Sequence, residues 1–262
     1  MIEHLPRTEE IKLPEILEAS RVAEIAQAVF ESTSFEVGRQ FVESNVVLTM
    51  SGLKPTTEIS VLLEDEMDLP KFSAELDRIS DLLETAGVNI MQAIGPLTHA
   101  FEQKPVAMSG ITNLRGVERT AKLSRFKGMP DFKSSGGIEG YERWLSKVWQ
   151  WLQAAQDSGS IPKDYNLQYI NEGIRLGYPD QAIWDFAGAL AKGDKSRLIH
   201  SHLAIPDMRK HHGALPSYAY YPEHAQDPNI VDNIAMTKRI LMEFYASPGY
   251  QAIMADPRWK AA

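Results

Sequence analysis

The chain has 262 residues, a formal net charge of −8 and a hydrophobic fraction of 44%. This length and composition are typical of a folded protein of one large or two small domains with a substantial core. The acidic balance argues against a nucleic-acid-binding protein, which normally carries a basic surface, and against docking on anionic lipid. We therefore expect no nucleic-acid partner and no membrane partner.

The sequence contains no cysteine. This excludes disulfides, thiol catalysis and zinc or iron–sulfur sites with cysteine ligands, and it is compatible with a reducing compartment. The first fifteen residues are acidic and lack the apolar core of a signal peptide, and no apolar run is long enough to cross a bilayer. We expect a soluble, cytoplasmic protein.

The pattern of apolar residues predicts an α+β layer in the N-terminal half. One helix is predicted from about Leu13 to Glu31, and a second is predicted to begin at Asp68-Leu69-Pro70 and to end near Gly87. Four short apolar runs predict strands: Asn45–Met50, Glu58–Leu63, Val88–Ile94 and Val106–Ile111. The expected layer therefore has about four strands and two helices.

The C-terminal half is predicted to be mainly α-helical. Gly, Pro and Ser interrupt the pattern between Lys127 and Gly137, which suggests a division into domains 1–130 and 131–262, although a single domain fits as well. Beyond it, helices are predicted over five segments: Ile138–Gln156, Tyr165–Leu176, Pro179–Lys192, Asn229–Ala246 and a short one after Ser247-Pro248.

Residues 199–224 are the most unusual part of the chain. They hold five of the seven histidines: His200, His202, His211, His212 and His224. Histidine has a pKa near neutral pH and is the commonest metal ligand, so this density favours a metal site, a proton relay or an anion site. Long connections without regular structure are often functional. A polar surface loop is the alternative.

A transition metal is one candidate cofactor of this segment. If residues 198–203 are extended, His200 and His202 point to the same side, and Asp207 and His224 could complete the ligand set after the chain turns. The spacing matches no recognised zinc signature. No nucleotide-binding motif is present, and the lack of cysteine excludes an iron–sulfur cluster with cysteine ligands.

A second hypothesis keeps the segment as a ligand site without a metal. Arg209 is expected to fix an anionic group, with Tyr220 and Tyr221 adding hydroxyl groups and flat apolar surface. The candidate catalytic residues, which could carry protons, are His202, His211, His212 and Tyr218.

The segment favours a small-molecule enzyme or a ligand-binding protein with an anionic ligand. A non-catalytic interaction or assembly protein, with the N-terminal layer as its binding surface, is the alternative. Buried and converging His, Asp and Tyr side chains would favour the first hypothesis. An exposed apolar strip or an unpaired strand edge would favour the second. No motif specifies the substrate, the reaction or the oligomeric state.

Overall fold

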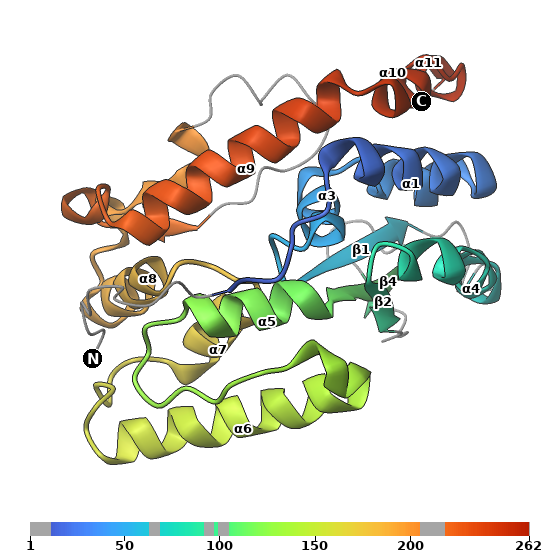
Figure 1. Cartoon of the computed structure of the whole chain (residues 1–262). Coiled ribbons are helices and arrows are strands. Elements are labelled where there is room, and N and C mark those ends of the chain that lie inside the picture. Colours follow the sequence, from blue (N-terminus) through green and yellow to red (C-terminus); the bar gives the residue numbers. More distant parts are fainter. Residues whose placement is uncertain (1–11, 63–68, 92–96, 99–104, 205–217, 262) are drawn as a thin grey trace.

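The computed structural model describes residues 12–62, 69–91, 97–98, 105–204 and 218–261, which form an α+β fold (Figure 1). The helices up to residue 130 are α1 (Ala19–Ser32), α2 (Phe35–Gln40), α3 (Ser44–Ser51), α4 (Leu69–Glu84) and α5 (Leu114–Leu123). The later helices are α6 (Gly137–Asp157), α7 (Leu167–Arg175), α8 (Asp180–Lys192), α9 (Pro228–Ala246), α10 (Pro248–Met254) and α11 (Arg258–Ala261). The strands are β1 (Thr56–Leu62), β2 (Val88–Met91), β3 (Leu97–Thr98), β4 (Pro105–Asn113), β5 (Ile199–His200) and β6 (Ala219–Tyr220). Short 3₁₀ turns are η2 (Ser134–Gly136), η3 (Lys195–Arg197), η4 (Ser201–Ala204) and η6 (Pro222–His224).

The larger sheet is antiparallel and centred on β4. Strand β1 pairs with one edge of β4, while β2 and β3 pair one after the other with the opposite edge. Ile59 and Val61 of β1 are buried, whereas Glu58, Ser60 and Leu62 between and beside them are exposed. This alternation shows that one face of the sheet packs on the core while the other is open.

The strand predicted at Asn45–Met50 is wrong, because these residues belong to helix α3. Seven of the eight residues of α3 are buried, so the helix is apolar on nearly every side. A short run of this kind has no helical periodicity and cannot be distinguished by pattern from a buried strand. Gly52 ends the helix in a left-handed conformation, with φ of 82°. In the described residues, the layer therefore has three main strands and the short β3.

The N-terminal half also has more helices than the two expected. Helix α1 begins at Ala19, later than the predicted Leu13, and α2, α3 and α5 were not predicted. Helix α5 follows β4 directly, because the side chain of Asn113 accepts hydrogen bonds from the backbone N–H groups of Arg115 and Gly116.

The helices predicted for the C-terminal half are confirmed as α6 to α10, within a few residues at each end. Asp227 caps α9 by accepting from the backbone N–H of Asn229 at 2.9 Å, and Pro228 occupies the first turn. Ser247 caps α10 in the same manner. The division at residue 130 stays a prediction.

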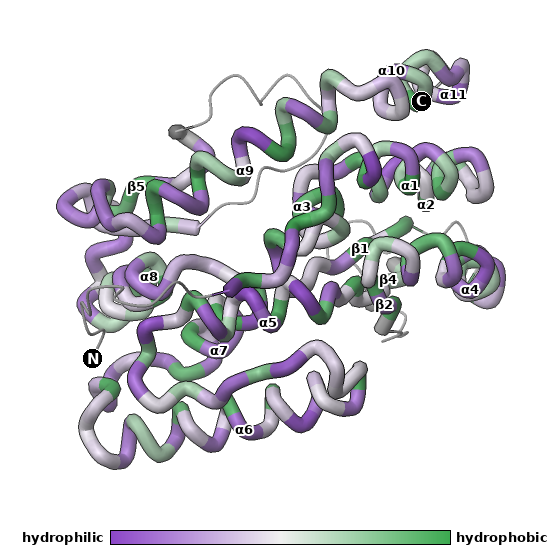
Figure 2. Tube along the Cα trace, viewed as in Figure 1, coloured by the Kyte–Doolittle hydropathy of each residue, from purple (hydrophilic) through white to green (hydrophobic). Residues whose placement is uncertain are grey.

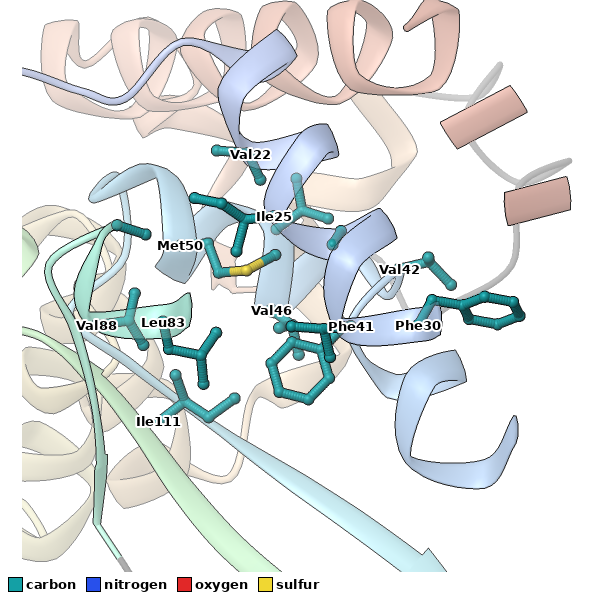
Figure 3. Packing of buried hydrophobic residues seen from close by; sticks show 14 of the residues in the cluster. Val22, Ile25, Phe30, Phe41, Val42, Val46, Met50, Leu83, Val88 and Ile111 are labelled. Atoms are coloured by element: carbon teal, nitrogen blue, oxygen red, sulfur yellow. The ribbon is translucent and has the colours of Figure 1, made fainter. Parts of the chain in front are cut away.

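The main hydrophobic core joins both ends of the chain. Figure 3 shows Val22 and Ile25 of α1 facing Met50 of α3, with Leu83 of α4 and Ile111 of β4 nearby. Helices α9 and α10 contribute further buried residues, and α9 crosses one side of the molecule beside α1 and α3 (Figure 1). Along α6 and α9, hydrophobic and hydrophilic residues alternate at helical spacing (Figure 2).

A second core holds helix α8 in position. It is built on the aromatic side chains of α6, among them Tyr141 and Trp144, and includes Ile174 of α7 and Ile183 of α8. A third and smaller cluster packs Ala182 of α8 against β6 and α9. Helix α8 is thus fixed on two sides. The described part of residues 199–224, called here the histidine-rich segment, lies next to it through β6.

Candidate functional site

The described parts of the histidine-rich segment form a small ribbon beside α8. Strands β5 and β6 pair in antiparallel fashion, with Ile199 opposite Tyr220. Turn η6 follows β6 and leads into α9. Four predicted site residues lie outside the described residues: Asp207, Arg209, His211 and His212. Their predicted roles stay predictions.

His200 and His202 lie close to each other. Their ring centres are 5.5 Å apart, with 33° between the ring planes. The backbone is extended at Ile199 and His200, but the 3₁₀ turn η4 begins at Ser201 and includes His202, so the two rings lie close without the fully extended backbone that was expected. His200 is exposed and His202 is half-buried.

The three tyrosines of the segment are buried. Tyr218 and Tyr220 pack with Tyr178 and Ile230, and the Tyr218 hydroxyl lies 3.5 Å from the carbonyl oxygen of Ile230, to which it donates. Burial raises the pKa of Tyr218 well above its usual value, and the neighbouring Tyr220 and Tyr178 add to the effect. Tyr218 therefore stays protonated at any physiological pH.

His224 pairs with the acid Asp185. His224 Nδ1 lies 2.9 Å from Oδ1 and 2.8 Å from Oδ2 of Asp185. The Asp185 side chain is only 2% exposed, whereas the His224 side chain is 39% exposed. Because the carboxylate accepts from Nδ1–H, the second ring nitrogen, Nε2, is the one available to a bound molecule.

Two further groups hold the Asp185 carboxylate in position. The amide of Gln181, one turn earlier on α8, donates to Oδ1 at 2.8 Å. The backbone N–H of Tyr221 donates to Oδ2 at 3.0 Å. With His224 these groups satisfy both carboxylate oxygens, as a buried charge requires. The pairing of Asp185 with His224 is therefore fixed from both α8 and η6.

Tyr221 is fixed by a second acid. Its hydroxyl donates to Asp194 Oδ1 at 2.8 Å, and the Arg197 guanidinium lies 5.1 Å from the centre of its ring. Burial, followed by the hydrogen bond to Asp194, raises the pKa of Tyr221 to about 12. The ring of Tyr221 lies 6.4 Å from that of His224. Tyr221 thus forms a rigid wall beside the histidine.

His224 and Tyr221 line a cavity of about 500 Å³, which we call the dyad pocket. Tyr165 and Trp184 form its aromatic side, with ring centres 5.0 Å apart. Its charged side chains are Asp185, Lys192, Arg197, and Glu223. The Asp185 carboxylate is occupied by its own hydrogen bonds, and Glu223 pairs with Arg197 at 3.2 Å. Among the described residues, Lys192 is therefore the cation of this pocket that has no ion pair.

A second cavity, of about 350 Å³, lies on the other side of α8 and is called here the aromatic pocket. It is lined by Tyr169, Phe186 and Tyr218, and also by His200. The residues of α8 that face the dyad pocket and those that face the aromatic pocket occupy opposite sides of the helix, as the period of 3.6 residues requires. Of the predicted site residues, Tyr221 and His224 line the dyad pocket, His200 and Tyr218 line the aromatic pocket, and the described residues His202 and Tyr220 line neither.

Among the residues that the structure describes, no group of three or more His, Asp or Glu side chains could hold a metal ion. His224 faces the dyad pocket and His200 the aromatic pocket. Asp207, the fourth member of the predicted metal site, lies outside the described residues. The metal hypothesis stays a prediction that these residues do not support.

Sequence reasoning did not identify Asp185, Gln181, Asp194 or Arg197. Asp185 stands within the apolar run AIWDFAGAL of a predicted helix. An acid surrounded by apolar residues is rarely buried without a partner, so this position could have been singled out. Its partner could not, because His224 is 39 residues further along the chain.

Comparison of the chain with protein-family models, with curated proteins and with solved structures gave no match. Within the described ranges, no helix is both long and apolar enough to cross a membrane.

Proposed function

We propose that this protein binds a small anionic molecule in the dyad pocket and exchanges a proton with it through His224. The supporting observation is the pairing of the half-exposed His224 with the buried Asp185. The proposal covers both a small-molecule enzyme and a ligand-binding protein, since the pairing serves proton transfer in one case and hydrogen bonding in the other.

The chemistry follows from the two ring nitrogens. Asp185 holds the hydrogen on Nδ1, so Nε2 presents its lone pair and can accept a proton from a bound acid or hydroxyl. The imidazolium formed in this way is stabilised by the Asp185 carboxylate 2.8 Å away. Lys192 is placed to attract the anionic group, and Tyr165 with Trp184 offers flat apolar surface to the remainder of the molecule.

The proposal is tested by His224→Ala and Lys192→Ala. The probes are inorganic phosphate and a panel of small mono- and dicarboxylates. Their binding is measured by ligand-observed NMR and by calorimetry. We expect at least one probe to bind the wild type, and each substitution to weaken its binding about tenfold or more, as is usual for a hydrogen bond to a charged group. Lys147→Ala, at an exposed lysine of α6, is the matched control for charge.

Two results would contradict the proposal. One is unchanged affinity in folded His224→Ala. The other is equal weakening by Lys147→Ala, which would show that only the overall charge matters. His200→Ala separates this proposal from the metal hypothesis, because His200 lines the aromatic pocket and not the dyad pocket.

The alternative, an interaction or assembly protein, has one observation in its favour. Leu62 is 53% exposed at the end of β1, the outer strand of the described sheet. Against it, Gln40 of α2 accepts a hydrogen bond from the backbone N–H of Ser60, so this edge is partly covered. Light scattering over a range of concentrations tests self-association through this edge, and a constant monomer mass argues against it.

A further inference from the structure

A third cavity, of about 460 Å³, lies where the two halves of the chain meet and is called here the junction cavity. It is lined by α5, by the corner between α7 and α8, and by residues 229–239 of α9. Leu13 and Leu53 close it from the N-terminal side. It shares no lining residue with the dyad pocket, so its occupant is independent of the proposed function.

Two buried side chains of opposite charge line this cavity. Arg119 of α5 is 8% exposed and Asp180, the first residue of α8, is 7% exposed. A guanidinium Nη2 of Arg119 lies 3.4 Å from the sulfur of Met236, so Met236 packs against the charged end of the side chain. Charged groups are costly to bury, and their presence together on a cavity wall is typical of a binding site.

The Asp180 carboxyl is held by neighbours on one oxygen. Oδ2 accepts from the Ser124 hydroxyl at 3.0 Å and from the backbone N–H of Arg125. Arg125, in the loop after α5, is the charged group that acts on Asp180, and Arg119, Asp232 and Arg239 are the other charged side chains that line the cavity. Arg125 also pairs with Asp227 at 3.4 Å, so its charge is shared between two acids. Burial raises the pKa of Asp180 to about 6.

We propose that the junction cavity binds a small zwitterion, a molecule with one carboxylate and one ammonium group as in an amino acid. The carboxylate pairs with Arg119, which offers a planar set of N–H donors. The ammonium pairs with Asp180. Apolar atoms of the ligand contact Leu53, Leu123 and Met236.

The test is a panel of free α- and ω-amino acids, with binding measured by thermal shift and then by calorimetry. For the tightest ligand, the N-acetylated form removes the ammonium charge and the amide form removes the carboxylate. Each derivative is expected to bind about tenfold or more weakly than the zwitterion. Equal binding of either derivative overturns the proposal, and so does the lack of any binding up to about 10 mM, which is weaker than the usual range for specific sites.

Asp180→Asn is the main variant. The amide oxygen can replace Oδ2 and keep both hydrogen bonds, so the fold should be retained. In the wild type at pH 6, an ammonium beside Asp180 lowers its pKa and releases up to about half a proton per ligand. Calorimetry in two buffers of different ionisation enthalpy measures this release.

We expect Asp180→Asn to bind more weakly and to release no proton. Retained proton release in this variant would overturn the assignment of Asp180. Arg119→Lys tests the other charge, since lysine keeps the charge but loses the paired donors. Arg143→Lys, at an exposed arginine of α6, is its matched control.

Discussion

At the scale of single residues, the site depends on the pairing of His224 with Asp185, two residues that are far apart in the sequence. The density of histidines drew attention to residues 199–224, but it gave no order of importance among the five. The structure distinguishes them by their neighbours, since His224 contacts a buried carboxylate and His200 contacts another histidine ring. Such neighbours depend on tertiary packing, which short-range patterns do not encode.

The shape of the dyad pocket can be changed at a single glycine. A Cβ atom at position 188 would lie 2.5 Å from the Tyr165 hydroxyl, the mobile end of a side chain. In Gly188→Ala the Tyr165 ring must therefore shift, while alanine favours the helix by about 0.5–1 kcal/mol. We expect nearly unchanged stability with altered affinity for the probe that binds the wild type. Denaturation and calorimetry check the two parts, and unchanged affinity would place the ligand elsewhere.

At the scale of elements, the sequence predicted amphipathic helices well and buried ones badly. Helix α6 was predicted from its apolar side, and α7 to α10 were predicted from the Gly, Pro and capping residues at their ends. Helix α3 is buried almost throughout, and its β-branched residues resemble those of a strand. The strands β1 and β4 were found because they combine apolar runs with flanking turn residues.

Helix α5 packs closely against the segment before β1, so a larger side chain at their contact should destabilise the protein. A Cβ atom at Gly116 would lie 2.4 Å from the backbone oxygen of Lys54, which cannot move as a side chain can. We expect Gly116→Ala to lower the free energy of unfolding by about 1–3 kcal/mol, the usual cost of overpacking.

Gly140→Ala is the matched control for this substitution. Gly140 lies within α6, and a Cβ atom there meets nothing within 4 Å. This change should stabilise the protein by about 0.5–1 kcal/mol. Equal effects of the two substitutions in urea denaturation would argue against the close packing of α5.

At the scale of the whole molecule, the halves meet at a buried lysine. Lys54 is 6% exposed, its Nζ donates to Asn45 at 2.9 Å, and it lies 5.4 Å from the centre of the Tyr178 ring. Burial lowers its pKa to about 8, and the nearby Glu172 only partly opposes this effect.

This pKa predicts how stability depends on pH. The folded protein binds fewer protons than the unfolded chain between the folded pKa of about 8 and the usual 10.5, so Lys54 makes the protein more stable as pH rises through this window. The gain is about 3 kcal/mol at most. We expect the difference in unfolding free energy between wild type and Lys54→Met to change with pH by this order. Denaturation at pH 7 and pH 10 measures it, and a difference independent of pH would contradict the buried charge.

The central claim is that His224 Nε2 faces a ligand while Asp185 holds Nδ1–H. NMR of the protein with isotope-labelled histidine rings tests this most directly, with His224 assigned by the signal lost in His224→Gln. We predict a hydrogen on Nδ1 in the free protein and a saturable shift of the His224 signals with phosphate or a carboxylate. A hydrogen on Nε2, or no shift for any probe up to about 10 mM, would contradict the account.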